Sequence, residues 1–158
     1  MASYYNIEVM PSRHTGSPRE RRALAAFINL MRAANTIQTL SNRHLELHGL
    51  TPSQFAVLEA LYHVGPLCLS ELAQKILRTS GNLTMVVDNL EKSGYVKRVP
   101  SAEDRRFIRA EITDSGRKLI ASVFPRHAGQ IADLMSRLTP DEQDTLRELC
   151  RKLGTGQE

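Results

Sequence analysis

The stretch SGNLTMVVDNLEKS, residues 80–93, decides the fold of this chain. Its apolar residues stand at i, i+3, i+4 and i+7 and form one helical stripe: Leu83, Val86, Val87 and Leu90. The opposite face is short, hydrogen-bonding and nearly uncharged, whereas an ordinary solvent-facing helix favours Glu and Lys. The members of that face are Ser80, Gly81, Asn82, Thr84, Met85, Asp88 and Asn89. The sequence therefore predicts a helix that packs on one side and presents a polar surface on the other.

Two short strands are predicted directly after this helix, which we expect to begin at Thr79 and to end at Gly94. They are YVKRV, residues 95–99, and FIRAEI, residues 107–112. In the second, apolar and polar residues alternate with the period of a half-exposed strand. The stretch SAEDRRF, residues 101–107, then forms the tip of a β-hairpin and concentrates four charges there.

Two further helices are predicted before this unit. In TPSQFAVLEAL, Thr51 acts as N-cap and Gln54 completes a capping box, and the helix ends at Gly65. A short helix follows over about residues 69–77. The order of helix, short helix, amphipathic helix and hairpin is that of a winged helix-turn-helix, which we assign to residues 50–113.

Long helices flank this lobe. Residues 1–18 show no period and predict a mobile arm, and residues 19–49 predict one long helix that ends at its final glycine. Residues 114–158 predict two helices, of which the first is kinked or divided at Pro125 and the second is capped by Thr139. The expected fold is mainly α with a small β-hairpin and about six helices. The segments 19–49 and 114–158 supply apolar surface for dimerisation.

Composition excludes several classes of protein. Hydrophobic residues make up 41% and charged residues 24%, which is typical of a globular chain. No apolar run is long enough to span a membrane, and the N-terminus lacks a signal core, so we expect a cytoplasmic protein. Two cysteines, Cys68 and Cys150, are too few for a disulfide framework. The absence of a phosphate loop, a nucleophile motif and a complete metal set predicts no enzyme and no cofactor.

The charge distribution favours an anionic partner. Residues 78–109 carry seven Lys and Arg against four Asp and Glu, whereas residues 114–158 carry seven of each. The major groove of DNA admits one helix with short polar side chains, and a helix N-terminus favours phosphate. The predicted DNA contacts are Thr79, Ser80, Gly81, Asn82, Thr84, Met85, Asn89, Lys97, Arg98, Asp104, Arg105 and Arg106.

Asp104 has two interpretations that are compatible with each other. Its carboxylate can orient a neighbouring arginine by a charge-assisted hydrogen bond, or it can bond its own backbone in the turn. The whole polar surface also has a plainer interpretation, a solvated face with no partner, or a winged helix that binds protein rather than DNA.

The segments LTPSQFAVLEAL, LSELAQKI, SGNLTMVVDNLEKSGYVKR and EDRRFIRAEITDSG resemble the MarR family of bacterial transcription regulators. The family pattern usually has Leu where Ile112 stands. The resemblance implies a homodimer joined through its first, fifth and sixth helices. This dimer would bind a pseudo-palindromic operator in double-stranded DNA and usually repress transcription until a ligand or an oxidant releases it. It also implies that Arg106 enters the minor groove and that Arg105 contacts the backbone.

The resemblance further implies a small-molecule effector between the dimerisation helices and the DNA-binding lobe. In this chain that region includes Arg43, His44, Phe55 and Tyr62, which suit an aromatic acid or a phenol. The SGNLT opening resembles a branch of the family that responds to phenols and quinone-like compounds. Alternatively, each of these residues has only a structural role and packs without binding a ligand.

The sequence also allows two other sensing mechanisms, zinc binding and cysteine oxidation. His44 and His48 stand at i, i+4 and can share a zinc ion, although two ligands are an incomplete set. Cys150 lies beside cationic residues that favour a thiolate, so it is a candidate redox site. Family members that sense hydroperoxides carry a cysteine early in the first helix, and this chain has none there.

Overall fold

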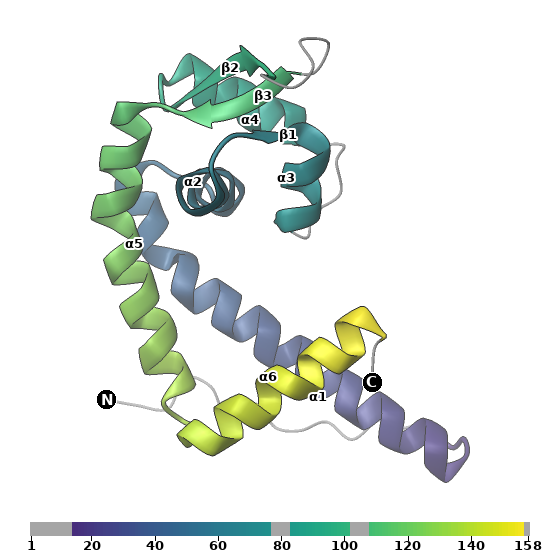
Figure 1. Cartoon of the computed structure of the whole chain (residues 1–158). Coiled ribbons are helices and arrows are strands. Elements are labelled where there is room, and N and C mark those ends of the chain that lie inside the picture. Colours follow the sequence, from purple (N-terminus) through teal and green to yellow (C-terminus); the bar gives the residue numbers. More distant parts are fainter. Residues whose placement is uncertain (1–13, 77–82, 102–107, 157–158) are drawn as a thin grey trace. The chain divides into compact units, whose positions relative to one another are not determined.

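The computed structural model describes residues 14–76, 83–101 and 108–156 (Figure 1). The chain divides into two units, with the boundary in the sequence between Leu40 and Ser41. The first unit is the helix α1 up to Leu40, and the second contains everything after it. The elements are α1 (Pro18–Asn42), the 3₁₀ helix η1 (Arg43–His48), α2 (Pro52–Val64), β1 (Leu67–Cys68), α3 (Leu69–Lys75), α4 (Leu83–Lys92), β2 (Val96–Pro100), β3 (Ile108–Ile112), α5 (Asp114–Met135) and α6 (Pro140–Thr155).

The first predicted helix is shorter than its periodicity suggested. The α-helix ends at Asn42, and Arg43–His48 continue as the tighter η1 helix. Gly49 stops η1 as predicted, because its φ of 66° lies in the left-handed region that suits glycine. The prediction of one α-helix to residue 48 is therefore wrong for its last six residues. Of the predicted arm, residues 1–13 lie outside the described residues.

The core of the second unit lies where α2, α4 and α5 meet the sheet. Thr51 and Gln54 form the predicted capping box at the start of α2, which ends at Gly65. Apolar side chains from these elements pack together with less than a tenth of their surface exposed, among them Phe55, Val57, Leu58, Leu61, Leu72, Leu83, Val87, Leu90, Ile120 and Val123. This core holds the polar face of α4 in a fixed orientation within its lobe.

The sheet has three antiparallel strands in the order β1-β3-β2 (Figure 1). The pairing of β2 with β3 runs from Val96↔Ile112 to Pro100↔Ile108, which confirms the two predicted strands. The third strand, β1, was not predicted. It has only two residues, of which Leu67 pairs with Ala110, and so short a segment shows no period in the sequence.

The C-terminal helices α5 and α6 begin at their predicted N-caps, and α5 is continuous through Pro125. Thr113 caps α5, and Thr139 forms a capping box with Glu142 at the start of α6. The helix α5 runs on through Pro125, so of the two predicted outcomes the division is wrong, and a kink there stays a prediction. The carbonyl that loses its bond to Pro125 belongs to Ala121, which is exposed and open to water. No described helix is long and apolar enough to cross a membrane.

Candidate nucleic-acid interface

The described part of α4 has the two faces that the sequence predicted. Leu83, Val87 and Leu90 are at most 4% exposed, because they pack into the core of the lobe. On the other side Thr84, Met85 and Asn89 are exposed, and 59% of the surface of Met85 is open to solvent. The predicted contacts Thr79, Ser80, Gly81 and Asn82 lie outside the described residues. From Leu83 onward the outward face therefore presents the uncharged side chains of Thr84, Met85 and Asn89, together with the partly exposed Asp88.

The described strands bring cations beside this helix. Lys97 on β2 faces Glu111 on β3 across the ladder, with the Lys97 amine and the Glu111 carboxylate 3.4 Å apart. More than half of the Lys97 side chain remains exposed, so its amine is available to an anion as well. The predicted wing-tip residues Asp104, Arg105 and Arg106 lie outside the described residues.

Arg98 behaves differently from Lys97. Its guanidinium bonds the carboxylate of Asp88 at 2.5 Å and also that of Glu91, both on α4. Its backbone N–H donates to Glu91 Oε1 at 3.1 Å. The hydrogen bond with Asp88 is the main cause that raises the pKa of Arg98 above its ordinary value, and the bond with Glu91 adds to it. The structure therefore shows Arg98 joined to α4, whereas the sequence suggested a DNA contact.

The base of the hairpin is fixed to α5. The Thr113 hydroxyl donates to the carbonyl of Gly94 at 2.7 Å, and the Ser115 hydroxyl donates to the same oxygen at 2.7 Å. A Cβ at Gly116 would collide with the backbone carbonyl of Tyr95. Gly116 is therefore the residue that lets α5 begin directly against the strand, which explains the Thr-x-x-Gly spacing in the sequence.

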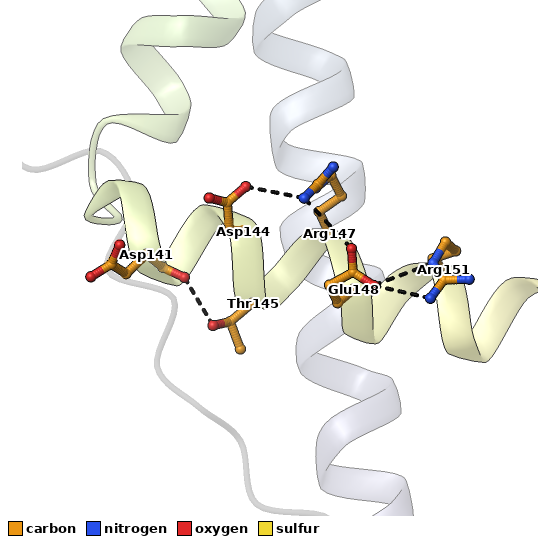
Figure 2. Close-up of polar contacts among 6 residues, drawn as sticks. All are labelled: Asp141, Asp144, Thr145, Arg147, Glu148 and Arg151. Atoms are coloured by element: carbon orange, nitrogen blue, oxygen red, sulfur yellow. Dashed lines mark hydrogen bonds and ion pairs between the residues drawn. The ribbon is translucent and has the colours of Figure 1, made fainter. Parts of the chain in front are cut away.

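Helix α6 is also two-faced, but neither of its faces is covered among the described residues. Figure 2 shows a row of ion pairs along it, in which Arg147 contacts Asp144 and Glu148, and Arg151 contacts Glu148. The apolar residues Leu146, Leu149 and Leu153 stand on the opposite side at helical spacing. Of these, 56% of the surface of Leu149 and 74% of that of Leu153 are exposed.

Helix α1 has a similar apolar surface. Phe27 is 59% exposed and Met31 is 43% exposed. Single exposed apolar side chains are common, but side chains of this size at i and i+4 form a continuous patch. The two flanking segments therefore carry the apolar surface that the sequence analysis assigned to dimerisation.

The residues predicted to bind an effector are partly brought together. His44 and Phe55 are buried, and both rings lie against a third ring, that of His127 on α5, with centroids 5.3 Å and 4.5 Å away. His127 Nδ1 is 3.2 Å from the Ser41 carbonyl. Neither ring nitrogen of His44 makes a hydrogen bond of ordinary geometry among the described residues. Burial is the main cause that lowers the pKa of His44, with smaller contributions from His127, Arg126 and His48 and partial opposition from the Ser41 backbone.

The other two predicted effector residues have different surroundings. Tyr62 is half-buried against the core and its ring meets that of His63 edge-on, whereas Arg43 is exposed on η1. A pocket of about 410 Å³ opens on a neighbouring face of α2, and none of the four predicted residues lines it. Its walls are Ala56, Glu59, Ala60, His63, Val64, Lys75 and Ile76. Sequence reasoning missed His127, which no local motif marks.

The geometry adds no support for the predicted zinc site or for the predicted redox role of Cys150. The described residues contain no group of three or more His, Cys, Asp or Glu that could hold a metal, and the His44 and His48 rings meet at 6.4 Å. Cys150 is exposed on α6, but two of its basic neighbours, Arg147 and Arg151, are paired with carboxylates. Cys68 is half-buried and lies 3.0 Å from the Ser70 hydroxyl.

Comparison with known proteins identifies the family. The model of the MarR family matches residues 50–108. The HTH-type transcriptional regulator MhqR of Bacillus subtilis (strain 168) is 41% identical over 133 residues, which cover 84% of this chain and 92% of that protein. This chain belongs to the MarR family. Transcription regulators of this kind are a non-enzymatic class of protein.

Two further relatives extend the match beyond the lobe. The transcriptional repressor MprA of Escherichia coli (strain K12) is 28% identical over 161 residues, covering 96% of this chain and 89% of that protein. Sco3205, a MarR family transcriptional regulator from Streptomyces coelicolor solved in complex with DNA, superimposes with a TM-score of 0.78 and 26% identity over 92% of both chains. This MarR-family chain is accordingly a DNA-binding transcription regulator with a winged helix fold.

Proposed function

We propose that this MarR-family regulator is a homodimeric repressor that binds a pseudo-palindromic operator and is released by a small aromatic ligand. The observation that carries the proposal is the outward face of α4, on which Thr84, Met85 and Asn89 are exposed and uncharged, while Leu83, Val87 and Leu90 on the other face are buried. Side chains of this kind discriminate base edges in the major groove. The name of the relative MprA supports repression as the direction of control.

The DNA surface in this proposal extends beyond α4. Lys97 supplies an exposed cation from the wing strand. The wing-tip residues Arg105 and Arg106, with Asp104 as orienter, and the first turn at Thr79 to Asn82 remain predictions from the sequence. A narrow minor groove has strong negative potential, which suits an arginine at the tip of the wing.

A dimer follows from the uncovered apolar surfaces. The patches on α1 and α6 need a partner, and a second copy of the chain supplies identical patches across a two-fold axis. The same symmetry places two α4 helices on one side of the dimer, where they read half-sites about one helical turn apart. The operator is therefore expected to be a pseudo-palindrome.

The effector site is proposed at the cluster of His44, Phe55 and Tyr62, with Arg43 at its edge. A buried imidazole whose ring nitrogens make no hydrogen bond of ordinary geometry, as at His44, is uncommon in folded proteins. A phenol or an aromatic carboxylate would supply a well-aligned partner and would stack on the neighbouring rings. Since His44 and Phe55 fill their own space here, the ligand would have to displace one of these side chains.

The test is binding to genomic DNA fragments, including the promoter of the chain's own gene, with and without a panel of phenols, quinones and aromatic acids. The proposal expects a protected pseudo-palindrome and release by one aromatic class. It further expects His44→Ala to abolish release without abolishing DNA binding. Release that is unaffected by His44→Ala would refute the effector site, and asymmetric protection by a monomer would refute the dimeric repressor.

A further inference from the structure

The ion pairs of Arg98 suggest a role that differs from a DNA contact. Arg98 stands on β2, and its two partners Asp88 and Glu91 stand one turn apart on α4. About a quarter of the Arg98 side chain is exposed, against 43% for Asp88 and 38% for Glu91. The Arg98 side chain is thus less exposed than either partner, and its guanidinium is turned toward α4, where it bonds both carboxylates.

Asp88 is the more consequential partner because of its position on the helix. It follows Thr84 and Met85 by one turn and precedes Lys92 by one turn, so it shares the outward face of α4 with these residues. A free carboxylate there would be repelled by the phosphates of a bound duplex, which carries one negative charge about every 1.7 Å along its axis. An arginine that pairs with the carboxylate reduces this repulsion.

The pairing also joins two elements that must act together on DNA. The backbone N–H of Arg98 and its guanidinium both bond Glu91, so main chain and side chain of β2 attach to the same residue of α4. Arginine is suited to this task because its planar fork can bond two carboxylates, which a lysine amine does with less geometric constraint. The wing strand is thereby held in one register against the reading helix.

We propose that Arg98 is a positioning residue for DNA recognition, which holds β2 against α4 and cancels one of the two carboxylate charges beside the reading face. It does not itself bind a phosphate. The proposal requires only that the chain binds DNA, and it is independent of repression, of the effector and of dimerisation.

The experiment measures the affinity of the full chain for a duplex that the wild type selects from a random-sequence library, at several salt concentrations. The variants are R98Q, the triple variant D88N/E91Q/R98Q, and R147Q. Arg147 is a matched control, because it also pairs with two carboxylates, Asp144 and Glu148, but on α6. Thermal unfolding of each variant reports whether it folds.

The proposal expects R98Q to bind roughly tenfold more weakly. The triple variant, which lacks both carboxylates as well, is expected to recover the part of this loss that comes from repulsion between the unpaired carboxylates and the phosphates, and R147Q is expected to bind like the wild type. A direct phosphate contact predicts otherwise: the triple variant would stay as weak as R98Q, and both would have a salt slope reduced by about one. That result, or wild-type affinity for R98Q, overturns the proposal.

A second measurement serves if R98Q does not fold. The variant D88N/E91Q keeps Arg98 but removes its partners, so the guanidinium becomes available to a phosphate. The proposal expects a salt slope that is steeper by about one. An unchanged slope would mean that Arg98 already contacts a phosphate in the wild type, and would overturn the proposal.

Discussion

Helices α4 and α6 are both amphipathic, but the apolar face of α4 is buried and that of α6 is exposed. In α4 the stripe of Leu83, Val87 and Leu90 is buried, and only the polar face is open. In α6 no residue is buried, and Leu149 and Leu153 are exposed. The row of ion pairs lies on the opposite side of this helix (Figure 2). The free surface of α4 is therefore suited to a polar duplex, and the free surface of α6 to an apolar protein partner.

The largest expected effect lies on the buried face of α4. Leu90→Ala removes a side chain that is 1% exposed and leaves a cavity in the core of the lobe. We expect the free energy of unfolding to fall by about 2–5 kcal/mol, as for other buried leucines. Urea unfolding followed by circular dichroism measures it. A loss as small as that of an exposed residue would show that α4 is not anchored by this stripe.

The apolar face of α6 gives the next effect. Leu149→Lys together with Leu153→Lys places charges on the surface proposed for dimerisation. Each leucine contributes about 1.5–3 kcal/mol when fully buried, so the pair is expected to convert the dimer to a monomer. Sedimentation equilibrium measures the mass, and Arg147→Gln on the opposite face is the control. A variant that remains dimeric would place the subunit interface elsewhere.

The polar face of α4 is expected to affect binding but not folding. Asn89→Ala should weaken binding to the selected duplex by about 1–3 kcal/mol, as for a lost base contact. Its effect on unfolding should stay within about 0.5 kcal/mol, since the residue is exposed. Fluorescence anisotropy and thermal unfolding on the same sample separate the two quantities. Equal losses in both would contradict the division between the two faces.

Sequence reasoning succeeded where the signal is local. The capping boxes at Thr51 and Thr139, the stop at Gly49 and the stripe of α4 all depend on neighbours within a few residues, and the structure confirms them. The order of the predicted elements indicated a winged helix-turn-helix, and the resemblance indicated the MarR family. The comparisons support both.

The rest depends on contacts between residues far apart in the chain. Strand β1 pairs with β3 through only two residues, and His127 meets Phe55 only because α5 packs on α2. Arg98 shows the same difficulty. From the sequence, a basic residue beside the DNA-recognition helix is predicted to bind a phosphate. The structure shows instead that its partners are Asp88 and Glu91 on the facing helix α4.

The smallest expected effect concerns pH and the cluster at His44. Burial holds the pKa of His44 below its ordinary value of 6.5, so the unfolded chain takes up a proton at a higher pH than the folded chain does. The contribution of neutral His44 to the stability of the fold is therefore fully present above pH 6.5 and is lost as the pH falls through 6.5 toward the lower folded-state pKa.

His44→Phe keeps a ring in this space but cannot titrate, so the stability of the variant should depend less on pH over this range. Thermal midpoints of wild type and variant on both sides of pH 6.5 measure the difference. Parallel pH profiles of stability would mean that His44 is not buried in its neutral form. The proposed effector site at the His44 imidazole would then lose its support.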